Sequence, residues 1–127
     1  MQPIQLFELA SRQAEWLQTR QTVVSSNIAN ANTPAYKAKD VSPFDQVLDN
    51  TQLPMAATSP MHFVDSPGDT YVVESGIDKG ATSQLSGNSV DLSGELEKEG
   101  MVKRDYDLNT GIVKAFNQMM LTTVRKG

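Results

Sequence analysis

Apolar and small residues near the start of the chain recur at alternating steps of three and four, the spacing of a helix with one buried stripe. The stripe consists of Phe7, Ala10, Ala14, Leu17, Val24, Ile28 and Ala31, with polar Gln21 between Leu17 and Val24. Pro3 suits the first turn of a helix, whereas Pro34 disfavours helical geometry at Thr33. The pattern predicts a helix over residues 3–31, followed by Asn32 as a left-handed cap.

The same spacing returns near the other end of the chain. Its apolar positions are Leu92, Leu96, Val102, Tyr106, Val113, Phe116 and Met120. Asn88 or Ser89 can cap the start of this helix, which is predicted over residues 91–125. Three glycines lie inside it, and each costs about 1 kcal/mol relative to alanine. This helix is therefore expected to depend on packing against a partner.

The middle of the chain, residues 32–90, has a different composition. It holds five of the six prolines and four of the eight glycines, which predicts mainly loops. Within it, residues 42–48 are predicted to form a helical turn and residues 70–74 a short strand. The whole chain of 127 residues is expected to be one folding unit, because it falls in the size range of a single domain.

These elements predict a mainly α fold. Two long terminal helices form an antiparallel coiled coil, and the irregular middle carries at most a short β-hairpin. A helix of about 30 residues is about 45 Å long, whereas a compact chain of this length has a radius of gyration of about 14 Å. The helices must therefore project beyond any globular part, and other chains are expected to cover their apolar stripes.

Composition and charge exclude several kinds of function. Eleven Lys and Arg residues against fifteen Asp and Glu residues give a net charge of −4, which argues against binding nucleic acid. There is no cysteine, and we expect no metal, cofactor or small-molecule substrate. The least favoured hypothesis is an enzyme centred on His62, the only histidine, with Asp65 or Asp69. Glu95, Glu97, Lys98 and Glu99 are predicted to form a solvated helix face.

The most informative stretch runs from Ser25 to Lys37, with the sequence SSNIANANTPAYK. Small residues permit close backbone approach, and asparagines near a helix stripe can set the alignment of a partner. The simpler interpretation is an ordinary helix end. The functional interpretation is a corner that sets the alignment of the helix with its partner. The residues that carry the motif are Asn27, Ile28, Ala29, Asn30, Asn32, Thr33, Pro34, Tyr36 and Lys37.

This stretch resembles the bacterial flagellar rod and hook family, whose members have the pattern S-N-I-A-N-x-x-T-P-G-Y-K after an amphipathic helix. The resemblance covers the first 40 residues and the stretch that begins GNSVDL at Gly87. Ala35 departs from it, because it stands where the family usually has glycine. The short length and the form T-P-x-Y-K-A-x-D point to a proximal rod member, with another short rod protein as the alternative.

The resemblance implies a non-catalytic subunit of the rod, the axial shaft that transmits torque through the flagellar basal body. Its partners would be copies of itself, other rod proteins, FliE and the membrane ring with its export gate. It would reach the periplasm through the flagellar type III apparatus without a cleaved signal peptide. The start of the sequence also lacks the pattern of such a leader. A cytoplasmic helical adaptor that binds partner helices is the alternative from another class.

Overall fold

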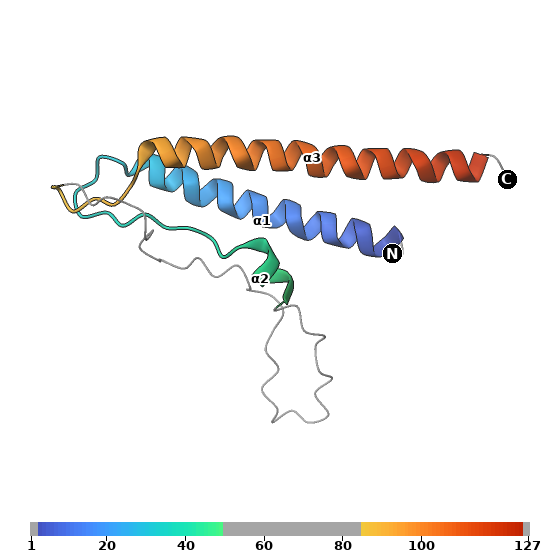
Figure 1. Ribbon diagram of the computed structural model, residues 1–127, viewed down its shortest axis with the longest axis horizontal. Helices are drawn as coiled ribbons and strands as arrows, with labels where there is room; N and C mark the ends of the chain where they lie inside the picture. The colour runs from blue at the N-terminus through green and yellow to red at the C-terminus, as the bar shows by residue number, and fades with distance from the viewer. Residues whose placement is uncertain (1–2, 50–84, 126–127) are drawn as a thin grey trace, which may run out of the picture.

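The computed structural model describes residues 3–49 and 85–125. The described part is mainly helical, with α1 (Pro3–Ala29), α2 (Phe44–Asp49) and α3 (Leu92–Arg125), and it contains no strand. The long helices α1 and α3 lie side by side and give the molecule an elongated shape (Figure 1). No helix in this part of the chain is long and apolar enough to cross a membrane. The predicted strand over residues 70–74 and its hairpin lie outside the described residues.

The pairing of α1 with α3 runs from one end of α1 to the other. Near the start of α1, the rings of Phe7 and Phe116 meet edge to face with their centroids 5.6 Å apart. Near its end, the side chain of Asn27 donates a hydrogen bond to the Glu95 carboxylate over 3.1 Å. Early residues of α1 thus contact late residues of α3, so the two helices run in opposite directions (Figure 1).

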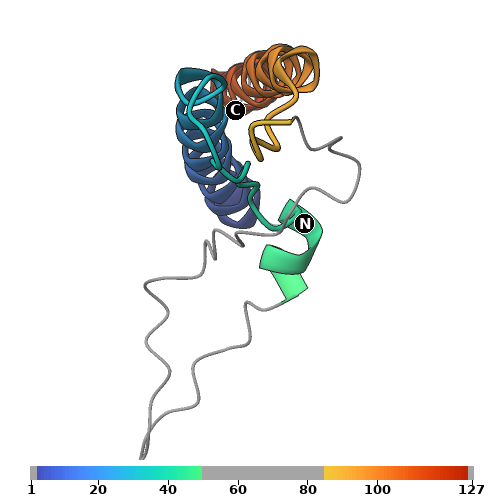
Figure 2. The same ribbon diagram turned by 90° about the vertical axis from the view of Figure 1, so that its left-hand side faces the viewer.

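A second packing layer lies on α1 and involves the chain that follows it. Residues 38–43, which we call the returning segment, run back along α1 and lead into α2, away from α3 (Figure 2). The buried cluster on α1 consists of Trp16, Leu17 and Val23 together with Val41 and Val102, and Phe44 and Val47 of α2 pack against it. The Trp16 indole N–H donates to the Ser42 carbonyl over 2.8 Å. The helical turn predicted over residues 42–48 is therefore observed as α2, shifted towards the C-terminus.

Both predicted helix caps are wrong. The helix α1 ends at Ala29, and the left-handed residue is Ala35, with φ of 59°, rather than Asn32. The chain does not turn left-handed at once because tight turns continue α1, with the Thr33 N–H donating to the Asn30 carbonyl over 3.0 Å. At the start of α3, Asp91 is the cap, since its Oδ1 accepts from the Ser93 N–H over 3.1 Å. Asn88 and Ser89 bond to other parts of the chain instead.

Candidate assembly interface

The N-terminal motif and the segment before α3 meet in one structure, which we call the corner (residues 26–41 and 86–95). Two segments from distant parts of the chain lie against each other there. The Ala35 N–H donates to the Ser86 carbonyl over 3.0 Å, and the Ser89 N–H donates to the Tyr36 carbonyl over 3.1 Å. The Ala38 N–H donates to the Ser89 hydroxyl over 2.9 Å. The corner thus ties the chain after α1 to the chain before α3.

Asn27 is the centre of the corner and is fully buried, with 0% of its surface exposed. Its Nδ2 donates to the Lys39 carbonyl over 2.7 Å and to the Glu95 carboxylate over 3.1 Å. Its Oδ1 accepts from the Lys39 N–H over 3.0 Å and from the Tyr36 hydroxyl over 3.4 Å. Because the same side chain both donates and accepts, neither aspartate nor leucine can replace it. Asn27 therefore joins α1, the returning segment and α3.

Asn88 closes the C-terminal end of α1 from a distant part of the chain. Its Nδ2 lies 2.9 Å from the carbonyl oxygens of Asn30 and Ala31 and 2.8 Å from that of Thr33. Carbonyls at the end of a helix have no partner within the helix, so an amide donor satisfies them. The Asn88 Oδ1 accepts from the Val90 N–H over 2.7 Å, which also holds the approach to α3. Its side chain is 1% exposed.

The acidic start of α3 is only in part the solvated face that the sequence predicts, because Glu97 is exposed, Lys98 and Glu99 are half-buried and Glu95 is buried. Glu95 is 3% exposed, and Lys98 bonds both Glu95, over 3.1 Å, and Asp40, over 3.2 Å. Arg20 approaches Asp40 at 3.9 Å. Burial lowers the pKa of Lys98, but the hydrogen bond to Glu95 and the charges of Asp40 and Glu95 outweigh this effect and raise it. Lys98 therefore stays charged at neutral pH and balances the buried Glu95 carboxylate.

At position 35 the family pattern has glycine, whereas this chain has alanine. Ala35 has a left-handed backbone, with φ of 59°. A residue with a Cβ costs about 1–2 kcal/mol in this conformation. Replacing Ala35 with glycine removes this cost but gives the unfolded chain more freedom, which offsets about 0.4–1 kcal/mol. We predict that Ala35→Gly raises the free energy of unfolding by about 0.5–1 kcal/mol. Thermal melting followed by circular dichroism measures the change.

The matched control for this prediction is Ala29→Gly, because Ala29 is exposed near the end of α1, where φ is not left-handed. Glycine there is expected to lower stability by up to about 1 kcal/mol. If Ala35→Gly lowered the melting temperature as Ala29→Gly does, the backbone strain at Ala35 would be refuted.

The other motif residues occupy different parts of the corner. Asn30 donates from its side chain to the Ser26 carbonyl over 2.7 Å and accepts from the Thr33 hydroxyl over 3.1 Å. The Lys37 ammonium donates to the Gly87 carbonyl over 3.0 Å. Ile28 is half-buried, whereas the exposed members are Ala29, Asn32, Thr33, Pro34 and Lys37. The structure therefore brings part of the motif together and leaves the rest at the surface.

The predicted stripe of α1 divides in the same way. Its buried members are Ala10, Leu17 and Val24. Ala14, Ile28 and Ala31 are half-buried, and Phe7 is 38% exposed although it touches Phe116. Sequence reasoning missed Trp16 and Val23, which lie one position before Leu17 and Val24. Their seven-residue spacing was the available signal, since it marks a second stripe on α1.

The predicted stripe of α3 is largely uncovered. Val102 is buried, and Val113 and Phe116 are half-buried. Four other members are exposed, with exposed fractions between 41% and 53%: Leu92, Leu96, Tyr106 and Met120. The arrangement suits a helix that is packed along one side and available to partners along others.

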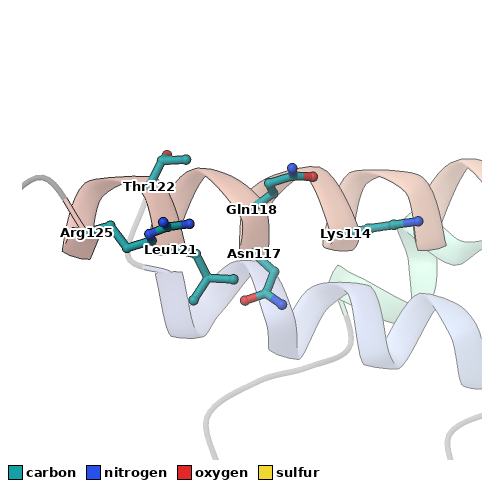
Figure 3. A pocket seen from close by; sticks show the side chains of 6 residues that line it. All are labelled: Lys114, Asn117, Gln118, Leu121, Thr122 and Arg125. Carbon is teal, nitrogen blue, oxygen red and sulfur yellow. The ribbon is translucent and has the colours of Figure 1, made fainter.

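The helix α3 has one surface hollow that could be considered as a binding site. A shallow hollow near its C-terminal end is lined by Lys114, Asn117, Gln118, Leu121, Thr122 and Arg125, and all six side chains come from this one helix (Figure 3). Across residues 3–49 and 85–125, no group of three or more potential ligands could hold a metal ion. His62, Asp65 and Asp69, the residues of the enzymatic hypothesis, lie outside the described residues.

Comparison with known proteins decides the family. A family model described as flagella basal body rod protein matches residues 14–37, the second part of α1 and the start of the corner. The flagellar basal body rod protein FlgB of Agrobacterium fabrum is 54% identical over 130 positions, which cover 99% of this chain and 97% of that protein. The chain belongs to the FlgB family. The resemblance drawn from the motif is therefore confirmed.

Two further FlgB relatives are more distant. The FlgB of Bacillus subtilis is 37% identical over 91 residues, which are 68% of this chain and 67% of that protein. The FlgB of Aeromonas hydrophila is 46% identical over 56 residues, which are 39% of this chain and 42% of that protein. The motif alone leaves the related rod protein FlgC as an alternative, and the similarity across the whole chain favours FlgB. The FlgB family is a structural family of the flagellar basal body rod, not a family of enzymes.

Proposed function

We propose that the chain is a structural subunit of the proximal rod and assembles by helix packing into the axial shaft that transmits torque. In the assembly, α1 and α3 act as an antiparallel coiled coil, and the corner fixes the position of one helix against the other. The chain contributes as one unit, because the corner links the end of α1 and the segment after it to the start of α3. Its role is mechanical, and the contacts between helices carry the load.

The observation that supports this proposal is the apolar surface left open along α3. Its exposed large side chains are Leu92, Leu96, Tyr106, Leu108, Ile112, Met119, Met120, Leu121 and Val124. A single small chain rarely leaves so many large apolar side chains on one helix open to water unless a partner covers them. Because α1 covers only one side of α3, other helices are the expected cover.

The expected neighbours follow from the family. They are other copies of this chain, other rod proteins, FliE and the membrane ring with its export gate. The place of assembly is the periplasmic part of the basal body, reached by type III export without a cleaved signal peptide. These assignments rest on the family resemblance, and the open apolar surface of α3 is compatible with several helical neighbours.

The proposal predicts that Leu96→Asp blocks assembly without unfolding the chain. Leu96 is 53% exposed, so a surface substitution there is expected to change stability by less than about 0.5 kcal/mol. A charge buried between helices, by contrast, is strongly unfavourable. In cells that lack their own copy, the variant should be exported but fail to restore swimming, and it should be absent from purified basal bodies.

The control is Thr110→Asp, which adds the same charge at an exposed polar position of α3. It should retain most of the swimming. Normal swimming by Leu96→Asp would refute the assignment of this apolar surface to assembly. Recovery of the unmodified chain in the cytosol rather than with basal bodies would favour the cytoplasmic adaptor.

A further inference from the structure

The helix α3 carries two lines of residues along its length, and they differ in polarity. The line that faces α1 consists of Glu95, Val102, Asn109 and Phe116, of which the first three are buried. The second line, which we call the open seam, consists of Met101, Leu108, Ile112, Ala115 and Met119. Leu108, Ile112 and Met119 are 62%, 46% and 58% exposed. The two lines are separated by about 90° around the helix at 3.6 residues per turn.

If burial of apolar surface alone decided the packing, α3 would turn its open seam towards α1. All five residues of the open seam are apolar, and turning α3 to place them against α1 would bury more apolar surface. The line that does face α1 contains a carboxylate and an amide, and burying such groups is unfavourable unless they are hydrogen-bonded. Specific polar contacts must therefore select the observed face.

Asn109 makes such a contact in the middle of the helix pair. It is 7% exposed, and its Nδ2 donates to the carbonyl oxygen of Ala10 over 2.8 Å. Ala10 and Ala14 have no side chain beyond Cβ, so α3 can approach the α1 backbone closely at this point. Further along α1, the buried side chains of Leu17 and Val24 cover the backbone. The bond is thus available at one position of Asn109 and is lost if α3 slides or turns.

We infer that Asn109 selects which face and register of α3 pairs with α1, and that it thereby keeps α1 off the open seam. A buried asparagine in a helix seam is known to specify alignment at some cost in stability. Glu95 and Asn27 hold the corner end of the pair, Gln21 and Glu99 add a longer contact next to it, and Asn109 is the buried polar contact further along the pair. This inference rests on the contacts within one chain, so it can fail without the proposed rod function failing, and the reverse also holds.

Pairs of engineered cysteines in the full chain can test the register, because the natural sequence has no cysteine. The side chains of Gln21 and Glu99 are joined by a hydrogen bond of 3.4 Å, so Gln21→Cys with Glu99→Cys, bridged by a short bismaleimide crosslinker, reports the observed register. Gln21→Cys with Lys103→Cys reports a slide of one helical turn. Each pair is treated with the crosslinker in the parent, in Asn109→Leu and in Asn109→Ala, and the yield of crosslinked chain is measured by electrophoresis.

The parent should crosslink mainly through the first pair. In Asn109→Leu, the yield of the shifted pair should rise about tenfold, because a shifted alignment no longer leaves the amide of residue 109 buried without a partner. Asn109→Ala, which removes the amide without adding volume, should raise it as well. Asn117→Leu is the matched control, since it makes the same change at an exposed position of α3 and should leave both yields unchanged.

A second measurement tests the face. Leu108→Cys on the open seam should react rapidly with a maleimide in the parent and about tenfold more slowly in the presence of Asn109→Leu, since burial protects a thiol. If both Asn109 variants retained the parent crosslink, with rapid labelling at position 108, the inference would be overturned. If Asn109→Leu lost its helical circular dichroism signal, the result with Asn109→Ala would decide by the same criteria.

Discussion

Asn27→Leu is expected to lower the free energy of unfolding by about 3 kcal/mol or more, one of the two largest effects that a single substitution should have in this chain. Leucine has the same branched outline as asparagine and is larger, so the change removes hydrogen bonds without opening a cavity. It leaves the Lys39 N–H and carbonyl without their partner and takes one donor from the buried Glu95 carboxylate. A buried polar group without a partner costs about 1–3 kcal/mol.

Urea unfolding followed by circular dichroism measures this effect. The matched control is Asn32→Leu, which makes the same change in the same motif at an exposed residue and should alter stability by less than about 0.5 kcal/mol. Asn27→Asp tests the direction of the hydrogen bonds, because a carboxylate keeps the acceptor for the Lys39 N–H but faces Glu95 as a like charge. If all three variants were equally stable, the buried network around Asn27 would be disproved.

The different roles of the two asparagines show what the sequence can and cannot predict. Three asparagines within six positions predict a polar corner, and the corner exists. The sequence does not show that Asn27 is buried while Asn32 is exposed, because this depends on partners far along the chain. Glu95 meets Asn27 across 68 positions, and Asn88 meets Asn30 across 58. Neither partner is marked by local spacing.

The same limit applies to Glu95. A run of charged residues at the start of a helix usually faces water, and sequence reasoning assigns Glu95 and Lys98 to such a face. The structure buries Glu95 because Asn27 and Lys98 satisfy its carboxylate, which makes burial of the charge tolerable. Only the meeting of three segments creates that environment.

Periodicity predicts the long helices well because it depends only on residues that are close together in the sequence. The helix α3 begins one residue after its predicted start and ends at the predicted residue, while α1 stops two residues before its predicted end. Periodicity identifies one stripe per helix, however, and α1 packs against two partners. The buried stripe residues Ala10, Leu17 and Val24 fit the prediction, whereas Trp16 packs against Ser42 and Phe44 on another side of α1. When a helix is covered on two sides, both stripes must therefore be identified before all its buried residues can be predicted.

Trp16→Ala is the other substitution with a large expected effect, a loss of about 4 kcal/mol in the free energy of unfolding. Trp16 is 6% exposed and packs against Phe44 with the ring centroids 5.7 Å apart. The Arg20 guanidinium lies 5.2 Å from the centre of its ring. Removing the ring leaves a cavity between α1 and α2, deprives the Ser42 carbonyl of its donor and removes the cation–π contact.

Trp16→Phe separates the packing from the hydrogen bond, since it keeps an aromatic ring but loses the indole N–H. It should cost about 1–2 kcal/mol, well below the cost of the alanine variant. Because Trp16 is the only tryptophan, both variants are followed by circular dichroism in urea, and the parent can also be followed by its fluorescence. A loss below about 1 kcal/mol in Trp16→Ala would mean that α2 and the returning segment are not part of the stable core. The helix pair and the corner would then carry the stability of the chain by themselves.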